Sequence, residues 1–303
     1  MSRFCMQAQC NANETRRATR SGLSSSPANV VAPRFHACYA LGMQGAVAQP
    51  GLSIFLRQAA RLTRANLKSR YRKTVAGFFW VILNPLIMFG VQSLIFSRIL
   101  NINVPNYYLF LVSGLIPWLF IVQSLEMCTP LFQYSGSLLK AFPVHPLVYL
   151  VAQLTDNFTN FLVAFTLILA PLVYFDQGPL ARFLLLPLPM LSLTAGVLAG
   201  AWLLATLQVF LRDTRYLTTF ALNVSFFLTP VFFSVDLVPE ELRWFVHVNP
   251  FYILIAPFQA LIHKADLALF WAKWLQAVAL AAVALILASL FWRAKRNAIY
   301  FHV

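Results

Sequence analysis

Residues 54–85 read IFLRQAARLTRANLKSRYRKTVAGFFWVILNP, a basic segment that passes directly into an apolar one. At about 100° per residue, a helix over the first part gathers five cations into one arc of roughly 80°. These cations are Arg57, Arg61, Arg64, Lys68 and Arg72. Leu52, Phe55, Leu56, Ala59 and Leu62 lie on the opposite side, so the helix is predicted to lie in the headgroup layer of a membrane near anionic lipid. A solvated helix of a soluble domain is the alternative, and the apolar runs that follow disfavour it.

The composition is that of a polytopic membrane protein. The chain has 303 residues, of which 60% are hydrophobic and 11% charged, whereas soluble domains carry about 25% charged residues. A net charge of +14 would suggest a nucleic-acid partner in a soluble protein. Here the cations gather on one side of the apolar runs, so membrane lipids and topology account for most of them and no nucleic-acid partner is expected.

Six stretches approach the roughly 20 apolar residues that a membrane span needs. They are residues 75–96, 107–127, 147–175, 183–211, 216–233 and 270–292. An even number of spans puts both termini on one side of the membrane. If that side is the cytoplasm, the inner segments hold thirteen cations and the outer loops hold five. The positive-inside rule therefore predicts that the N-terminus and the C-terminus are both cytoplasmic.

Two further segments are predicted to be short helices. Phe251–Ile262 is apolar but too short to cross, which favours a re-entrant or interfacial helix on the outer side, preceded by a short helix that starts at Pro239. A plain outer loop is the alternative. On the inner side, Leu131–Phe142 is predicted to form an amphipathic helix that Pro143 ends, with exposed Phe, Leu and Lys suited to a groove on a partner.

Residues 1–50 differ from the rest of the chain. They hold five arginines against one acid, together with a serine cluster and no long apolar run. We expect a disordered extension, or an upstream start in the gene with Met43 as the true start; a transit peptide is the less favoured interpretation.

Motifs for catalysis are missing from the sequence. There is no P-loop, HExxH or GxSxG pattern, and the five histidines are scattered. Glu126 and Asp156 lie within apolar runs and are candidates for function, but both lie close to the cytoplasmic boundary and a structural role is favoured. A GxxxG motif, Gly196 to Gly200, predicts close helix packing.

Five sequence motifs, in order, resemble the membrane subunit of ABC-2 type exporters. They are SRYRKTVAGFFWVILNPL (69–86), LVSGLIPWLF (111–120), RDTRY (212–216), FFLTPVFF (226–233) and NPFY (249–252). The resemblance covers residues 54–303 and is to the branch that moves lipid-linked polysaccharide such as O-antigen, capsule or teichoic acid. It implies an all-α permease domain over residues 51–303, with six transmembrane helices, an N-terminal interface helix and a re-entrant outer segment between spans five and six.

The resemblance also implies partners and site residues. A homodimer in the bacterial inner membrane would bind two copies of a cytoplasmic ABC ATPase, which would hold ATP and Mg; this chain would be no enzyme and would need no cofactor or metal. The residues of the ATPase-coupling helix would be Phe132, Tyr134, Leu138, Lys140 and Phe142. The residues of the interface helix would be Arg57, Arg61, Arg64, Lys68 and Arg72. The residues lining the polysaccharide path would be Trp80, Phe226, Phe227 and Phe233.

Other functions remain open at this point. An ABC-2 exporter of a drug or a small lipid fits the same motifs. A membrane-embedded transferase of lipid-linked sugars would need clustered acids or histidines, and an ion-coupled carrier would need charge near the midplane, so both are disfavoured.

Overall fold

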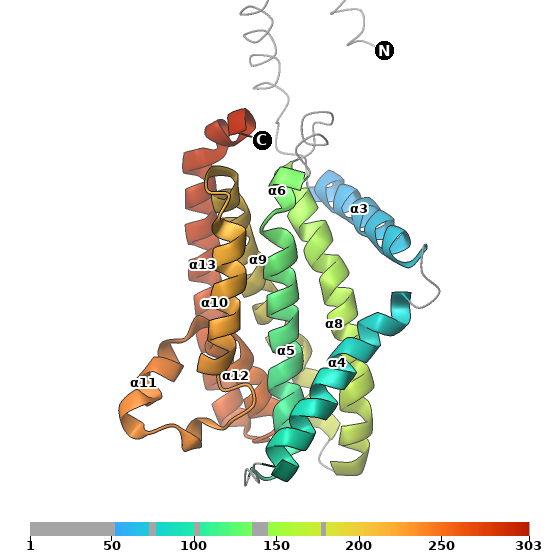
Figure 1. The fold of residues 1–303 in the computed structure, drawn as a ribbon, viewed down its shortest axis with the longest axis vertical. Coiled ribbons are helices and arrows are strands. Elements are labelled where there is room, and N and C mark those ends of the chain that lie inside the picture. The colour runs from blue at the N-terminus through green and yellow to red at the C-terminus, as the bar shows by residue number, and fades with distance from the viewer. Residues whose placement is uncertain (1–51, 73–76, 100–103, 135–144, 177–179, 303) are drawn as a thin grey trace, which may run out of the picture. The chain divides into compact units, whose positions relative to one another are not determined.

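The computed structural model describes residues 52–72, 77–99, 104–134, 145–176 and 180–302, and within these ranges the chain is helical with no strand (Figure 1). The α-helices are α3 (Leu52–Arg72), α4 (Gly77–Leu94), α5 (Tyr107–Cys128), α6 (Leu131–Tyr134), α8 (Pro146–Asp176), α9 (Pro187–Phe210), α10 (Thr214–Leu228), α11 (Glu240–Val248), α12 (Pro250–Ile262) and α13 (Leu267–His302). A π turn (Ile95–Ile99) continues α4, and 3-10 turns (Leu180–Leu185 and Val235–Leu237) precede α9 and α11.

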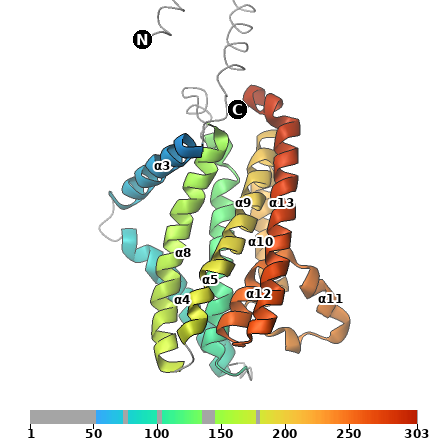
Figure 2. The ribbon, with the colours of Figure 1, turned by 180° about the vertical axis from the view of Figure 1, so that it is seen from behind.

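Helix α5 is the centre of the bundle. It is apolar around its whole circumference, which is the pattern of a buried helix, and 78% of its span is buried inside the subunit. It packs against α8, α9 and α12. Helix α13 runs beside α9 at the periphery (Figure 2), and only 17% of its span is buried, which leaves an apolar face for lipid.

The described residues contain four helices long and apolar enough to cross a membrane. They are Tyr107–Cys128, Pro146–Tyr174, Arg182–Phe210 and Leu267–Lys295. These confirm the second, third, fourth and sixth predicted spans. The first and fifth are shorter: α4 has 18 residues with Pro85 inside it, and α10 has 15. Fifteen residues rise about 22 Å, less than the roughly 30 Å of hydrocarbon in a bilayer.

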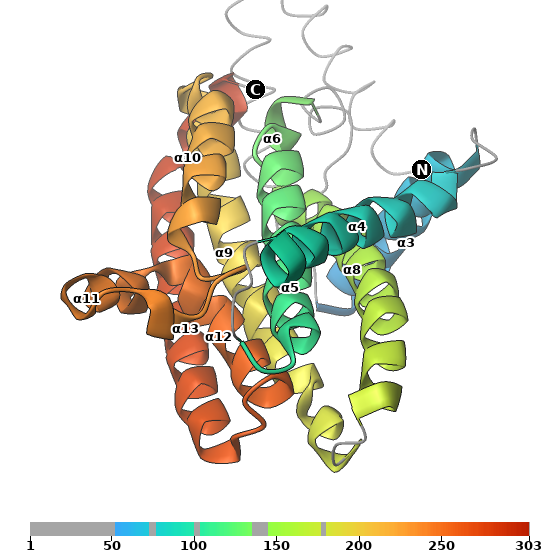
Figure 3. The same cartoon turned by 60° about the horizontal axis from the view of Figure 1, so that its bottom comes forward.

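The predicted pair of short helices before the last span is present. Helix α11 begins directly after Pro239, and α12 meets it at a bend of 97°, the geometry of a broken span or a re-entrant loop. Figure 3 shows α11 projecting from the side of the bundle. Counting this pair as one span raises the total from four to five.

The helix bundle has two ends that carry different helices. The end that carries α6, the C-terminal part of α13 and the start of α10 is called the α6 end, and the opposite end of α10, with α11 and α12, is called the α11 end (Figure 1). The predicted inner helix is described only as far as Tyr134, so Leu138, Lys140 and Phe142 lie outside the described residues, as does the extension 1–50. Arg72 and Trp80 lie on α3 and α4, but the structure does not describe their side chains.

Candidate functional site

The chain directly after α10 is held by close packing against α5 and α12. A Cβ on Gly114 of α5 would lie 2.7 Å from the carbonyl oxygen of Val231, closer than any side chain tolerates. The side-chain amide of Gln259 in α12 donates to the carbonyl of Pro230 at 2.8 Å. Because Thr229 and Val231 are fully buried, α10 ends inside the protein and not in a loose loop.

Asn249 connects this point to the helix pair α11 and α12. Its side-chain oxygen caps α12 by accepting from the backbone N–H groups of Phe251 and Tyr252 at 2.9 and 3.5 Å. Its side-chain amide donates to the hydroxyl of Thr229 at 2.9 Å. Three sequence motifs, around Gly114, Thr229 and Asn249, therefore meet at one place, which we call the α10 anchor (Gly114, Thr229, Pro230, Val231, Asn249 and Gln259).

An aromatic cluster surrounds the anchor. Trp118 of α5 lies 5.8 Å from the ring of Phe226 and 5.6 Å from that of Phe251, measured between centroids. Phe226 also contacts Phe227, while Phe232 contacts Phe233 at 5.1 Å. Of the predicted lining residues, Phe227 is 69% exposed, whereas Phe226 and Phe233 are half-buried.

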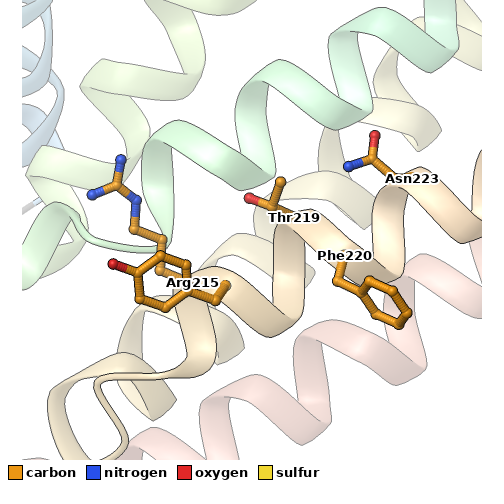
Figure 4. A pocket seen from close by; sticks show the side chains of 5 residues that line it. Arg215, Thr219, Phe220 and Asn223 are labelled. Carbon is orange, nitrogen blue, oxygen red and sulfur yellow. The ribbon is translucent and has the colours of Figure 1, made fainter.

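A shallow groove of about 510 Å³ follows the exposed face of α10 toward the α6 end. Its lining residues are Arg215, Tyr216, Thr219, Phe220 and Asn223. Their spacing of three and four residues places them on one side of the helix, and Figure 4 shows Arg215, Thr219 and Asn223 succeeding one another along it with Phe220 beside them. Tyr216 and Phe220 are 74% and 68% exposed. A face of aromatic rings, hydroxyl and amide groups is poorly matched to hydrocarbon, because polar groups in lipid lack partners.

Helix α6 is bound to the start of this groove by polar side chains. The side-chain amide of Gln133 donates to the backbone carbonyl of Gln208 at 3.0 Å, and the amide of Gln208 donates to the side-chain oxygen of Gln133 at 3.1 Å. Gln208 also donates to the carbonyl of Arg212 at 3.0 Å, across the break between α9 and α10. The Nη1 of Arg215 donates to the hydroxyl of Tyr134 at 2.8 Å.

The side chain of Phe132 in α6 is buried. Phe132 is 1% exposed, and its ring lies 5.7 Å from Trp292 of α13, which in turn contacts Trp202 of α9 and His145 before α8. Phe132 is expected from the sequence to be an exposed docking residue, and the structure places it in the core instead. Burial lowers the pKa of His145, so its ring is neutral at pH 7, and its Nδ1 accepts from the backbone N–H of Leu147 at 3.3 Å.

Helix α3 packs on α8 through small side chains. Ala59 is 5% exposed, and the hydroxyl of Thr63 donates to the backbone carbonyls of Ala59 at 2.9 Å and of Ala152 in α8 at 3.4 Å. The cations of α3 whose side chains are described are all exposed. They are Arg57, Arg61, Arg64 and Lys68. Their exposure agrees with the basic arc read from the sequence, while Leu56 on the predicted apolar side is exposed as well.

Polar side chains also join α5 and α8 within the apolar bundle. Asn157 donates to the hydroxyl of Ser124 at 3.4 Å and accepts from Gln153 at 3.2 Å. Asp156 is 1% exposed beside them. Glu126 is half-buried on α5 and directly precedes Met127, whose sulfur accepts from the side-chain amide of Gln153 at 3.6 Å. The residues that the structure describes contain no group of three His, Cys, Asp or Glu placed to hold a metal ion.

Residues 57–263 match the family of ABC-2 type transporters. The match covers more than half of the chain. This chain belongs to the ABC-2 transporter family. Membership makes it a membrane-spanning transporter subunit, and it agrees with the resemblance carried by the five sequence motifs.

Curated relatives of this ABC-2 permease are O-antigen export system permease proteins named RfbA. The Klebsiella pneumoniae protein is 26% identical over 204 residues, which are 66% of this chain and 78% of that protein. The Myxococcus xanthus protein is 27% identical over 205 residues, which are 67% of this chain and 79% of that protein. Both comparisons are to a transport permease and not to an enzyme of sugar transfer.

Sequence reasoning missed several residues of the permease that carry its contacts. No role is predicted for Gln133 or Gln208 from the sequence, although Gln208 is an amide in an otherwise apolar run. Gln259 lies likewise inside an apolar helix. The GxxxG motif was read correctly as a packing element: a Cβ on Gly196 would lie 2.7 Å from Leu254 of α12, and one on Gly200 would lie 3.4 Å from Leu125 of α5.

Proposed function

We propose that this chain is the membrane-spanning subunit of an ATP-driven exporter that moves lipid-linked polysaccharide, of the O-antigen type, across the bacterial inner membrane. Two copies form the transport path, and two copies of a separate P-loop ATPase on the cytoplasmic side supply the energy. Membership of the ABC-2 family and the relatives named as O-antigen export permeases support this assignment.

The exposed face of α10 is the observation that carries the proposal. Tyr216, Thr219, Phe220 and Asn223 form a stripe that is aromatic and hydrogen-bonding at once, with Phe227 continuing it toward the anchor. Sugar rings present hydroxyl groups at their edges and apolar C–H faces, so such a stripe matches a sliding polysaccharide. Because the stripe is exposed in the single subunit, a second copy facing it would enclose the path and shield its polar groups from lipid.

The proposed topology has six spans with both termini cytoplasmic. Helices α4 and α10 are the two short spans among the six. Helix α10 and the chain that continues from the anchor would together cross the membrane. The α6 end then faces the cytoplasm, because it carries the exposed cations of α3, α10 and α13, in agreement with the positive-inside rule. Helix α3 is the interface helix, and the pair α11 and α12 is the re-entrant outer segment.

The segment 132–142 is the proposed contact with the ATPase, with Tyr134, Leu138, Lys140 and Phe142 as docking side chains. Phe132, being buried on Trp292, anchors the base of this segment. Trp80, Phe226, Phe227 and Phe233 remain the proposed aromatic lining, and Phe220 and Tyr216 extend it toward the α6 end. ATP and Mg belong to the partner.

Reconstitution tests this function. The chain and its proposed P-loop ATPase partner are placed in proteoliposomes with a lipid-linked polysaccharide, and export is measured as ATP-dependent protection of the glycan from an added glycosidase. We expect Phe220→Ala and Asn223→Leu to lower export at least several-fold, while Leu287→Ala, an equally exposed position on α13, leaves it unchanged. Transport of small amphiphiles but not of glycan would overturn the assignment to polysaccharide.

A further inference from the structure

We propose that the hydrogen bond between Tyr134 and Arg215 is an exchangeable link through which the ATPase-facing segment acts on α10, while the pair Gln133 and Gln208 is the fixed pivot beside it. The inference rests on the proposed function and adds to it the residues that transmit motion. In this role Tyr134 and Arg215 are positioning residues.

The pivot is the more rigid of the two contacts. Gln208 is 3% exposed, and two hydrogen bonds run in opposite directions between it and Gln133. A third bond reaches Arg212 beyond the end of α9. Breaking this arrangement would leave amide groups buried without partners, which is unfavourable, so we expect Gln133 to stay attached to α9 during transport.

The link differs in its exposure. Tyr134 is 68% exposed and Arg215 is exposed as well, so water or another acceptor can replace the phenol oxygen at little cost. The bond is charge-assisted and short at 2.8 Å, which makes it strong enough to set the position of the guanidinium while it lasts. Exchange is therefore easier at Tyr134 than at Gln133, one residue away.

The positions of the two residues in the chain allow their hydrogen bond to transmit a displacement from the ATPase-facing segment to α10. Tyr134 is the last residue of α6 and lies within the segment 132–142 that is proposed to contact the ATPase. Arg215 lies in the first turn of α10 and also lines the groove with Thr219 and Asn223. A displacement of the segment by the ATPase would thus act first on Tyr134 and then on a side chain of the proposed substrate path. Phe132, packed against Trp292, keeps the base of α6 in place.

The experiment compares Tyr134→Phe in two backgrounds, the otherwise unchanged chain and Arg215→Gln, in the reconstituted complex with its ATPase. The readout is glycan exported per ATP hydrolysed, with the Tm of the purified complex as a check on folding. Removing one charge-assisted hydrogen bond is expected to lower this ratio roughly 5- to 10-fold in the unchanged background. It should have no further effect in the Arg215→Gln background, because the two residues act through one bond. The Tm should not change, since the ring is kept and exposed.

Two controls separate a link from a static contact. Tyr108→Phe, the same change at an exposed tyrosine of α5, should leave the ratio unchanged. Gln208→Met should lower the Tm, which Tyr134→Phe should not, since the pivot holds the structure together.

Each outcome decides the matter. An unchanged ratio in Tyr134→Phe overturns the link, and so does an equal loss in both backgrounds. If Arg215→Gln alone abolishes export, the second background gives no ratio to compare. The ratio of Tyr134→Phe in the unchanged background then decides whether the link stands. A wild-type complex that hydrolyses ATP without exporting glycan overturns the proposed function, and the link falls with it.

Discussion

At the α11 end, helix α10 stops where the carbonyl of Val231 leaves no room for a side chain on Gly114 and the amide of Gln259 binds the carbonyl of Pro230. At the α6 end, the same helix starts beside an exposed hydrogen bond between Arg215 and Tyr134. The first contact is made by backbone at van der Waals distance, and the second by two long side chains in reach of water. One helix is therefore fixed at one end and adjustable at the other, as its proposed role as a wall of the transport path requires.

The largest effect is expected from breaking the fixed end. Gly114→Ala would place a methyl group 2.7 Å from a backbone oxygen that cannot move aside, so we expect a loss of about 1–3 kcal/mol of stability. In an ordinary helix the same change stabilises by up to about 1 kcal/mol. Gly90→Ala on α4, where nothing lies within 4 Å of the new Cβ, is the matched control and should be neutral or stabilising. Thermal unfolding in detergent measures both, and equal Tm shifts for the two variants would contradict a tight anchor.

A smaller effect is expected where the anchor meets α12. Asn249→Ala removes the cap of α12 and the hydrogen bond to Thr229, with an expected loss of about 1–2 kcal/mol. Thr229→Val removes only the hydrogen bond and keeps the cap, so its loss should be nearer about 1 kcal/mol. The Tm of each variant checks this order. A greater loss in Thr229→Val than in Asn249→Ala would show that the cap contributes nothing.

The smallest effect concerns pH at the α6 end. Burial lowers the pKa of His145 below its ordinary value of 6.5, so the unfolded chain takes up the proton more readily than the folded one. The contribution of the neutral His145 to the free energy of unfolding should be complete above about pH 6.5 and should decline as the pH falls below that value. His145→Asn, which keeps an acceptor for the N–H of Leu147, should reduce the decline in Tm between pH 7.5 and 5.5. Part of it should remain, because burial also lowers the pKa of His263. An identical decline in the variant would exclude His145 as a contributor.

The sequence was sufficient for those features that depend on local pattern. The apolar runs predicted four of the long helices, Pro239 predicted the start of α11, and the arc of cations predicted the exposed side of α3. Helix length was less predictable. The run 216–233 was taken as one span, but α10 ends at Leu228, because Pro230 has no N–H to continue the helix and its carbonyl is bound by Gln259 instead.

The candidate site was predictable only in part. The motifs around Gly114, Thr229 and Asn249 stood out as pieces of a family pattern, yet nothing in their spacing shows that they touch. Phe132 was expected on the surface because it lies on a short amphipathic segment, whereas its ring fills a space beside Trp292, 160 residues further along the chain. Apolar residues near a membrane boundary give no sign of which face is covered by another helix.

By itself, the sequence determined that this chain is a helical membrane protein of the ABC-2 family and where most of its helices lie, because hydrophobic runs, prolines and caps act over a few residues. Only the tertiary structure decided which side chains meet. Gln133 and Gln208 are 75 residues apart, and Tyr134 and Arg215 are 81 apart. Their contact depends on how α6, α9 and α10 pack around α5, and packing is a property of whole helix faces that no single motif records.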